Sequence, residues 1–187
     1  MATTSDLRTG IMIRWNGQLH RVTEFYHHAP GNWRAMVIMK LKNVQSGKTI
    51  EERVRAGSDI EIVRVEKRTM QYLYRDGDRM HFMDTESFEQ LEIPEDTVGD
   101  GAQFLKENDM ADVLFYDETK ILGVELPPHV TLEVVETGVA VRGDTATSVN
   151  KPATLETGAV ISVPGFVNQG DYVKVDTRTG EYLERMK

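Results

Sequence analysis

The sequence predicts an all-β protein built from small barrels. Strand-like stretches recur at short, even spacing along its 187 residues, with turn residues between them. Asn16-Gly17 and Asp76-Gly77 each lie between apolar stretches and are strong signals for tight hairpins. No long amphipathic helix is apparent in the sequence. Together these patterns favour barrels or sandwiches.

Residues 1–64 are predicted to form an SH3-like barrel. Five short strands in about 60 residues are typical of such a fold. Asn16-Gly17 joins the first two strands, and Ser46-Gly47 turns the chain into the fourth. The expected strands include residues 11–15, 18–25, 35–42 and 49–54, and residues 60–65 are a possible connecting strand to the next domain.

Residues 65–127 are predicted to form a barrel of the OB kind. Asp76-Gly77 again marks a hairpin, and the polar residues 94–108 have room for one or two short helical turns near Phe104. Pro127-Pro128 stiffens the chain and removes two backbone donors, so we expect a domain boundary there. The expected strands cover residues 70–74, 80–83, 88–93, 113–116 and 121–126.

Residues 128–187 are predicted to form a third barrel. Its expected strands cover residues 131–137, 159–163, 172–176 and 181–186. Domains of about 60 residues bury only about 60% of the surface of the unfolded chain and are marginally stable alone. We therefore expect neighbouring domains to pack on each other in an elongated, fairly rigid molecule.

Charge is unevenly distributed along the chain, whose net charge is −8. Residues 1–64 carry ten Lys or Arg against six Asp or Glu, whereas residues 65–127 carry six against sixteen. The net charge argues against a protein that contacts phosphates over its whole surface. A basic first domain could still bind RNA while the acidic middle faces water or basic ribosomal protein.

The sequence lacks cysteine and lacks long apolar segments, and both absences exclude classes of protein. There is no cysteine, which excludes disulfides, thiolate nucleophiles and thiolate metal sites. The sequence lacks a basic leader followed by an apolar run, and no apolar stretch approaches about 18 residues. We expect a soluble, cytoplasmic protein.

A polar, aromatic and basic loop at residues 25–35 is the main candidate site. Pro30 fixes φ near the value of the second position of a tight turn, and Gly31 can adopt the positive φ that a type II turn needs next. Asn32 and Trp33 would then lie at or just past the tip of a long hairpin. A solvent-exposed turn with no role in binding fits the same local pattern.

Basic residues on the strands behind this tip could follow an RNA backbone, because alternate strand positions share one face. They are Lys40, Lys42, Lys48, Arg53 and Arg55. Trp33 beside Arg34 adds a stacking surface, and base stacking on an aromatic ring is worth about 1–3 kcal/mol. A solvated strand face is the alternative interpretation.

No catalytic set is apparent. His27 and His28 are adjacent, so in a strand they would face opposite sides and could not easily bind one metal. Contact with RNA or solvent is the expected role for both. We expect no metal, no cofactor and no enzymatic activity.

Residues 151–170 resemble the signature of bacterial translation elongation factor P. The matching positions are Lys151, Ala153, Gly158, Ile161, Val163, Pro164, Val167 and Gly170. Further similar segments are residues 71–74, 82–84, 88–90, 143–145 and 175–182, so the resemblance covers the full chain.

The resemblance implies three barrels, the first SH3-like and two OB-like, in an L-shaped, tRNA-like arrangement. It implies a factor that binds the ribosome between the peptidyl and exit sites and positions the CCA end of peptidyl-tRNA. Such a factor stimulates peptide bond formation and relieves stalling at consecutive prolines. The implied partners are the ribosome, peptidyl-tRNA and the exit-site codon of mRNA, and we expect a monomer away from membranes.

The resemblance implies two groups of contact residues, at the tip and in the C-terminal domain, and the strand pattern above gives a third, along the RNA backbone. The tip that contacts the CCA end would comprise Pro30, Gly31, Asn32, Trp33 and Arg34. The RNA backbone would be contacted by His27, His28, Lys40, Lys42, Arg53 and Arg55. The exit-site codon and the tRNA stem would be contacted by Gly143, Asp144, Thr145, Tyr182 and Arg185.

The tip departs from the family pattern. Asn32 occupies the position where family members carry a modified lysine or arginine, and a neutral amide can take neither modification. We expect an unmodified tip in which Trp33 or Arg34 contacts the CCA end, with Arg34 as the one nearby residue that could take a guanidinium modification. Residues 139–141 also lack the usual proline-glycine, which affects the detailed codon contacts.

Two alternatives remain beside the leading interpretation. One is a paralogue of the same family that acts on a different range of stalling sequences. The other is a general RNA-binding or chaperone protein built from OB domains, which would bind arbitrary single strands in a salt-sensitive way.

Overall fold

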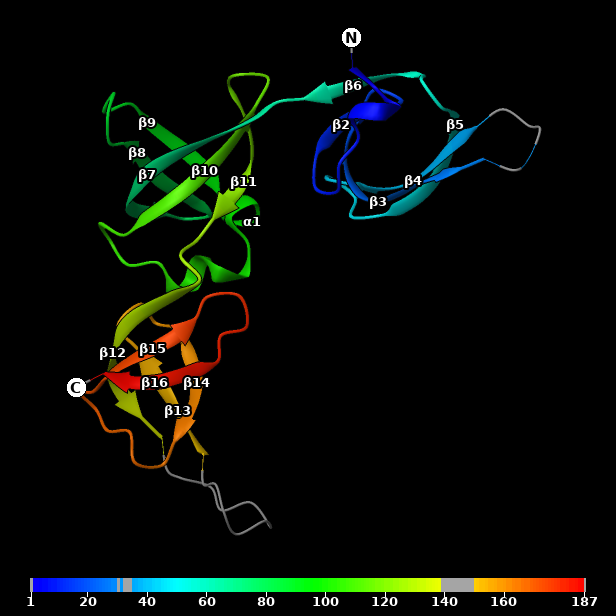
Figure 1. Ribbon diagram of the computed structural model, residues 1–187. Helices are drawn as coiled ribbons and strands as arrows, with labels where there is room; N and C mark the ends of the chain where they lie inside the picture. Colours follow the sequence, from blue (N-terminus) through cyan, green and yellow to red (C-terminus); the bar gives the residue numbers. More distant parts are fainter. Residues whose placement is uncertain (1, 30, 32–34, 139–149, 187) are drawn as a thin grey trace. The chain divides into compact units, whose positions relative to one another are not determined.

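The chain folds into three β-sheets (Figure 1). The structure is a computed structural model that describes residues 2–29, 31, 35–138 and 150–186. The predicted all-β fold is confirmed, since the helical elements of this part are single short turns. No helix within these ranges is long and apolar enough to cross a bilayer.

The chain divides into two compact units, which we describe separately. Residues 1–66 and 116–120 form one unit, and residues 67–115 and 121–187 form the other. The second unit therefore contains most of both predicted OB-like barrels.

The first sheet has the strand order β1-β6-β2-β3-β4-β5. Its elements are β1 (Ala2–Thr3), η1 (Thr4–Asp6), β2 (Met12–Trp15), β3 (Gln18–His28), β4 (Met36–Asn43), β5 (Thr49–Arg55) and β6 (Asp59–Val63). Asn16 and Gly17 adopt positive φ values of 50° and 75° between β2 and β3. The hairpin predicted from this dipeptide is confirmed.

Strand β6 corrects one expectation for this region. We interpreted residues 60–65 as a possible connecting strand, but β6 pairs with both β1 and β2 inside the sheet. Its residue Ile60 explains why, because this buried side chain belongs to the apolar core of the sheet. The core of the sheet consists of Leu7, Ile13, Val22, Val37, Met39, Leu41 and Ile60.

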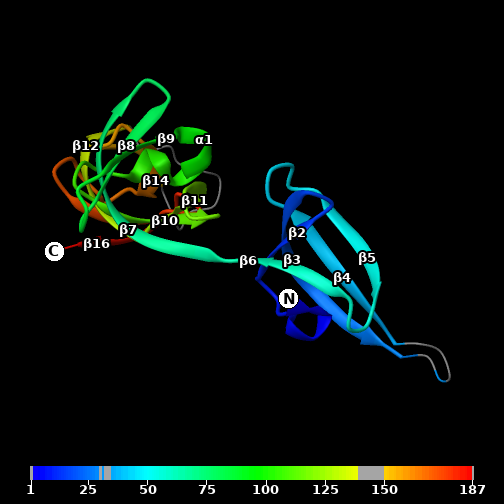
Figure 2. The same cartoon turned by 90° about the horizontal axis from the view of Figure 1, so that it is seen from above.

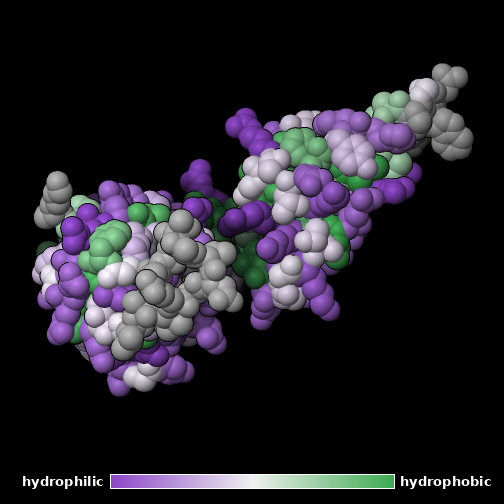
Figure 3. All heavy atoms as spheres, turned by 90° about the horizontal axis from the view of Figure 1, so that it is seen from below, coloured by the Kyte–Doolittle hydropathy of each residue, from purple (hydrophilic) through white to green (hydrophobic). Residues whose placement is uncertain are grey.

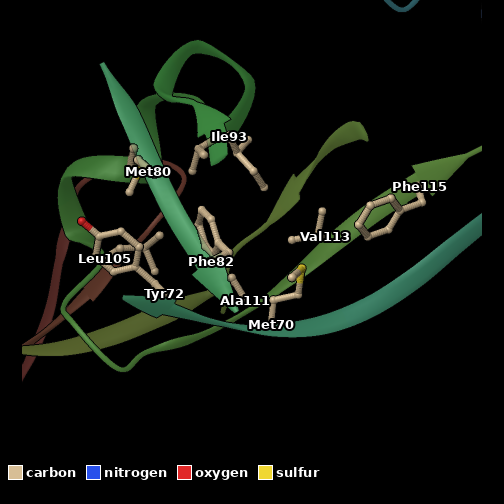
Figure 4. Close-up of a cluster of buried hydrophobic side chains, with 11 residues drawn as sticks. Met70, Tyr72, Met80, Phe82, Ile93, Leu105, Ala111, Val113 and Phe115 are labelled. Carbon is tan, nitrogen blue, oxygen red and sulfur yellow. The ribbon is translucent and has the colours of Figure 1, made fainter. Parts of the chain in front are cut away.

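The second sheet has the order β11-β10-β7-β8-β9. Its elements are β7 (Val65–Asp76), β8 (Arg79–Asp84), β9 (Gln90–Pro94), α1 (Glu95–Val98), η2 (Asp100–Phe104), β10 (Met110–Tyr116) and β11 (Lys120–Glu125). Phe82 is fully buried and lies in the middle of the apolar cluster drawn in Figure 4. The predicted short helical turns are confirmed as α1 and η2.

The strand expected at residues 88–93 begins two residues later, at Gln90. Phe88 lies in a turn with φ +61° and is 69% exposed. Its aromatic ring suggested a strand residue, but the backbone hydrogen bonds of the turn determine its conformation.

The third sheet has the order β14-β13-β12-β15-β16. Its strands are β12 (His129–Thr137), β13 (Asn150–Leu155), β14 (Val160–Pro164), β15 (Tyr172–Asp176) and β16 (Tyr182–Met186). We did not predict β13, whose Pro152 is an unusual residue for a strand interior. Pro152 lies opposite Ser162 of β14, and its carbonyl accepts a hydrogen bond from Gly138 at 2.8 Å.

The second and third sheets meet through side chains within one compact unit. Phe104, at the end of η2, is 3% exposed and belongs to the apolar core of the third sheet. A Cβ atom added at Gly180 would lie 3.2 Å from its ring, and one at Gly101 would lie 3.0 Å from the carbonyl oxygen of Thr177. The Thr177 hydroxyl also donates to the carbonyl of Pro127. The expected packing between neighbouring barrels is therefore present here.

Candidate functional site

The candidate site is built on the long β3–β4 hairpin and the adjoining strand β5. Strands β3 and β4 lie side by side along their whole length (Figure 2). Because His27 and His28 pair with Val37 and Met36, the loop is shorter than the 25–35 that we expected. Phe25 and Tyr26 favour extended strands, and β3 continues from them through both histidines, which pair with β4.

One face of these three strands carries the predicted RNA-contacting residues; we call it the outer face. Its first row is His28, Met36 and Arg55, and its second row is Tyr26, Ile38 and Arg53. Glu24, Lys40 and Glu51 form the third row, followed by Arg21, Lys42 and Thr49. The opposite face places Val37, Met39 and Leu41 in the core, so strand period alone separates the two faces.

The register brings together four of the predicted basic residues, Lys40, Lys42, Arg53 and Arg55, on the outer face. It also places His28 there, while His27 lies on the other side of β3 and contacts Phe25 edge-on. Lys48 precedes β5 and lies in the connection from β4. The outer face therefore contains most, but not all, of the predicted set.

Carboxylates neutralise part of the outer face. The Lys40 ammonium donates to Glu24 at 2.7 Å, and this hydrogen bond raises the pKa of Lys40. Arg53 lies 3.3 Å from Glu51. Arg55 and Lys42 form no ion pair with any residue in the described ranges. The row nearest the β3–β4 loop, with His28 and Arg55, is thus free of acidic side chains.

An aromatic ring that we did not select lies among these cations. Tyr26 is 49% exposed and lies opposite the buried Ile38, with Arg53 on the far side. The alternation of residues along β3 and β4 could have identified it. A base can stack on an exposed ring of this kind, while neighbouring guanidinium groups contact phosphates.

The loop itself lies largely outside the described residues. Gly31 is exposed and has a φ of +50°, which agrees with the positive φ expected for it. The other predicted tip residues, Pro30, Asn32, Trp33 and Arg34, fall outside the described ranges.

The third sheet holds the second group of predicted contact residues. Tyr182 is partly buried against the core, whereas Arg185 lies 3.4 Å from Asp171 and 5.5 Å above the ring of Phe166. The predicted residues Gly143, Asp144 and Thr145 fall outside the described ranges. The exposed guanidinium of Arg185 is therefore the clearest of these candidates.

No metal-ligand cluster is present in the described part of the chain, where no three His, Asp or Glu side chains converge. The surface in view mixes hydrophilic and hydrophobic residues (Figure 3). The outer face offers positive charge, hydrogen-bond donors and one exposed ring. Such a face suits contact with an RNA backbone rather than bond-making chemistry.

Comparison with known proteins identifies the family. Three family models match consecutive parts of the chain: the elongation factor P KOW-like domain at residues 3–60, its OB domain at 65–124 and its C-terminal domain at 130–185. The chain belongs to the elongation factor P family. This confirms the predicted family and gives the protein a role in translation.

Curated relatives agree over the whole length. The chain is 79% identical to elongation factor P of Roseiflexus sp. (strain RS-1) over 187 residues, 100% of both chains. It is 63% identical to elongation factor P of Chloroflexus aurantiacus over 186 residues, 98% of both chains. Among solved structures, an initiation factor 5A from Methanococcus jannaschii aligns with a TM-score of 0.56 and 20% identity, covering 66% of this chain and 92% of that one. That likeness shows a shared fold.

Proposed function

We propose that this translation factor binds the ribosome between the peptidyl and exit sites and holds the CCA end of peptidyl-tRNA. By doing so it stimulates peptide bond formation and relieves stalling at consecutive prolines. Holding a reactive end in place lowers the entropic part of a barrier, so the factor needs no catalytic group of its own. The ribosome performs the chemistry.

The observation that carries this proposal is the outer face next to the β3–β4 loop. His28, Tyr26 and Arg55 supply a cationic and aromatic surface there, in a chain whose net charge is −8. A localised basic surface on an acidic protein favours contact with one RNA site over general binding to RNA. Family membership supports the ribosome as the source of that RNA.

In this proposal the loop residues 30–34 contact the CCA end directly. Asn32 remains unmodified, and Trp33 or Arg34 supplies the contact. His28, Lys40, Lys42, Arg53 and Arg55 face the RNA backbone from the outer face, and His27 would contact it from the opposite side of β3. The strongest contribution comes from the arginine without an acidic neighbour, Arg55.

The C-terminal contacts are part of the same proposal. Gly143, Asp144 and Thr145 face the exit-site codon, and Arg185 contacts the tRNA stem. Tyr182 supports strand β16 from the core, since its side chain is partly buried there. The three domains of the proposal are residues 1–64, 65–127 and 128–187.

A reporter containing consecutive prolines tests the proposal in a translation extract depleted of the native factor. Wild-type protein should restore full-length product, whereas Trp33→Ala, Arg34→Ala and the double change Arg53→Ala with Arg55→Ala should each reduce the rescue several-fold. Arg79→Ala is the matched control, because this arginine lies on β8 and pairs with Glu92. Rescue by every variant at the wild-type level would refute the assignment of the outer face.

Two further measurements separate the alternatives. Intact-mass analysis of protein from its own host should show no added mass on residues 30–34. Binding to free single-stranded RNA should be weak, and binding to ribosomes with peptidyl-tRNA should be tight. Tight, salt-sensitive binding to arbitrary single strands would instead favour a general RNA-binding protein.

A further inference from the structure

Three hairpin turns, one in each sheet, share the same hydrogen bonds. They span residues 43–48, 84–89 and 176–181 and join β4 to β5, β8 to β9 and β15 to β16. In each turn, an Asn or Asp side chain at the first position accepts hydrogen bonds from two backbone N–H groups, at 2.8 to 3.2 Å. The same first residue exchanges backbone hydrogen bonds with the fifth and sixth residues, at 2.8 to 3.0 Å.

The fifth position of each turn requires a positive φ. It is Gly47 at +69°, Gly180 at +71° and Phe88 at +61°. Glycine adopts this conformation without steric cost, whereas a bulky side chain disfavours it. The other non-glycine residues with positive φ in the described ranges are Asn16, Asn108, Asp117 and Glu118, so Phe88 is the one bulky apolar residue among them.

Packing within the molecule does not explain Phe88. Its side chain is 69% exposed, the largest value among the large apolar residues of the described ranges, and it belongs to none of their core clusters. The turn that presents it is fixed by the Asp84 carboxylate, which accepts from Glu86 at 2.8 Å and from Ser87 at 2.9 Å. A rigid turn thus holds an aromatic ring in water.

The charges around the ring indicate the kind of partner. Glu86 and Glu89 flank Phe88, are exposed, and form no ion pair within the described part of the chain. The surrounding residues 65–127 carry six Lys or Arg against sixteen Asp or Glu. RNA phosphates would be repelled by this surface, whereas a protein rich in Lys and Arg would be attracted.

We propose that Phe88 is the anchor of a second docking surface, which inserts into an apolar pocket on a basic ribosomal protein. Glu86 and Glu89 form its polar rim and face lysine or arginine side chains around that pocket. Buried aromatic residues surrounded by a polar rim dominate many protein interfaces. This inference rests on the proposed binding to the ribosome and assigns that binding a protein contact separate from the RNA contacts of the outer face.

The test uses the full-length chain and purified ribosomes carrying peptidyl-tRNA stalled at consecutive prolines. Phe88→Gly should weaken binding about tenfold or more, because hot-spot residues have effects of this size. Phe88→Tyr should bind within about twofold of wild type. Val160→Thr, which changes an exposed apolar residue on β14 (63% exposed), is the matched control and should have no effect.

Thermal unfolding and crosslinking complete the test. Phe88→Gly should keep or raise the Tm, since glycine suits the positive φ, and a lower Tm would show that Phe88 acts through folding and overturn the inference. With p-benzoylphenylalanine at position 88, crosslinks to a Lys- and Arg-rich ribosomal protein support the proposal, and crosslinks to rRNA alone refute it. Equal binding by wild type and Phe88→Gly refutes this inference only, whereas no binding by wild type refutes the proposed function.

Discussion

The turns at residues 84–89 and 176–181 have matching hydrogen bonds but different surroundings. The second turn faces the joint between the two sheets of its unit, where Gly180 lies against the ring of Phe104 and Thr177 is 4% exposed. The first turn faces solvent and carries Phe88 at the position that corresponds to Gly180. The same backbone conformation therefore packs against another sheet at residues 176–181 and, in our proposal, presents a residue to a binding partner at residues 84–89.

The comparison shows how surroundings decide which residue a turn tolerates. At residue 180 both the positive φ and the nearby ring demand glycine. At residue 88 only the φ does, and a conformational cost of about 1–2 kcal/mol for a side chain is small enough to be retained. A side chain that serves binding can therefore be kept at such a position despite this cost.

The largest expected effect follows from removing the ring beside Gly180. Phe104→Ala should lower the free energy of unfolding by about 3–5 kcal/mol, because it leaves a cavity in the core of the third sheet. Urea denaturation of the full chain measures this change. Phe88→Ala is the control from the same domain and should change stability by less than about 1 kcal/mol; equal losses would contradict the comparison.

A smaller effect is expected for a methyl group added to the turn itself. Gly180→Ala should lower stability by about 2–4 kcal/mol, from the positive φ together with overpacking against Phe104. Gly47→Ala has nearly the same φ but nothing within 4 Å of the added atom, so it should lose only about 1–2 kcal/mol. If the two variants lose the same amount of stability, the contact with Phe104 does not constrain the turn at residues 176–181.

The smallest expected effect depends on pH. Hydrogen bonds from the Ser87 and Glu86 backbone lower the pKa of Asp84 below its ordinary 3.8, and those from Arg178 and Thr179 do the same for Asp176. Each carboxylate therefore adds stability above its unfolded pKa, and this contribution disappears as the pH falls through the folded pKa. Asn43 accepts the same hydrogen bonds without titrating in this range.

The double variant Asp84→Asn with Asp176→Asn should accordingly reduce the loss of stability between pH 7 and pH 3, measured by denaturant titration. At pH 7 its free energy of unfolding should differ from that of the wild type by no more than the contribution of one weak hydrogen bond per turn. Glu136→Gln, on the exposed side of β12, is the control. If the double variant loses as much stability between pH 7 and pH 3 as the wild type, the two carboxylates are no more stabilised in the folded state than in the unfolded chain.

Much of the fold could be predicted from local sequence. Asn16-Gly17 and Asp76-Gly77 mark turns that the structure contains, and alternation along β4 indicates which of its side chains face the core, although Ile38 on the outer face is also buried. Strand β13 was missed; it contains Pro152, whose carbonyl and missing N–H face Gly138, just past the end of β12, so the proline removes no hydrogen bond to β14. Local propensity also misplaced Phe88, since the turn overrides its preference for strands.

The candidate site was less predictable than the fold. Alternate basic residues on β4 and β5 indicated the outer face, but not which of them are neutralised. An irregularity between Val22 and Glu24 shifts the register of β3, and this shift places Glu24 opposite Lys40. Such pairings depend on contacts between strands and cannot be deduced from one strand alone.

The position of Phe104 has a consequence for dividing the chain. A fragment that ends at Pro127 would keep η2 but lose the third-sheet core that covers this ring. The fragment would expose an aromatic side chain that is 3% exposed in the intact chain, and would be prone to self-association. The central and C-terminal barrels should therefore be produced together, as one piece that melts in a single transition.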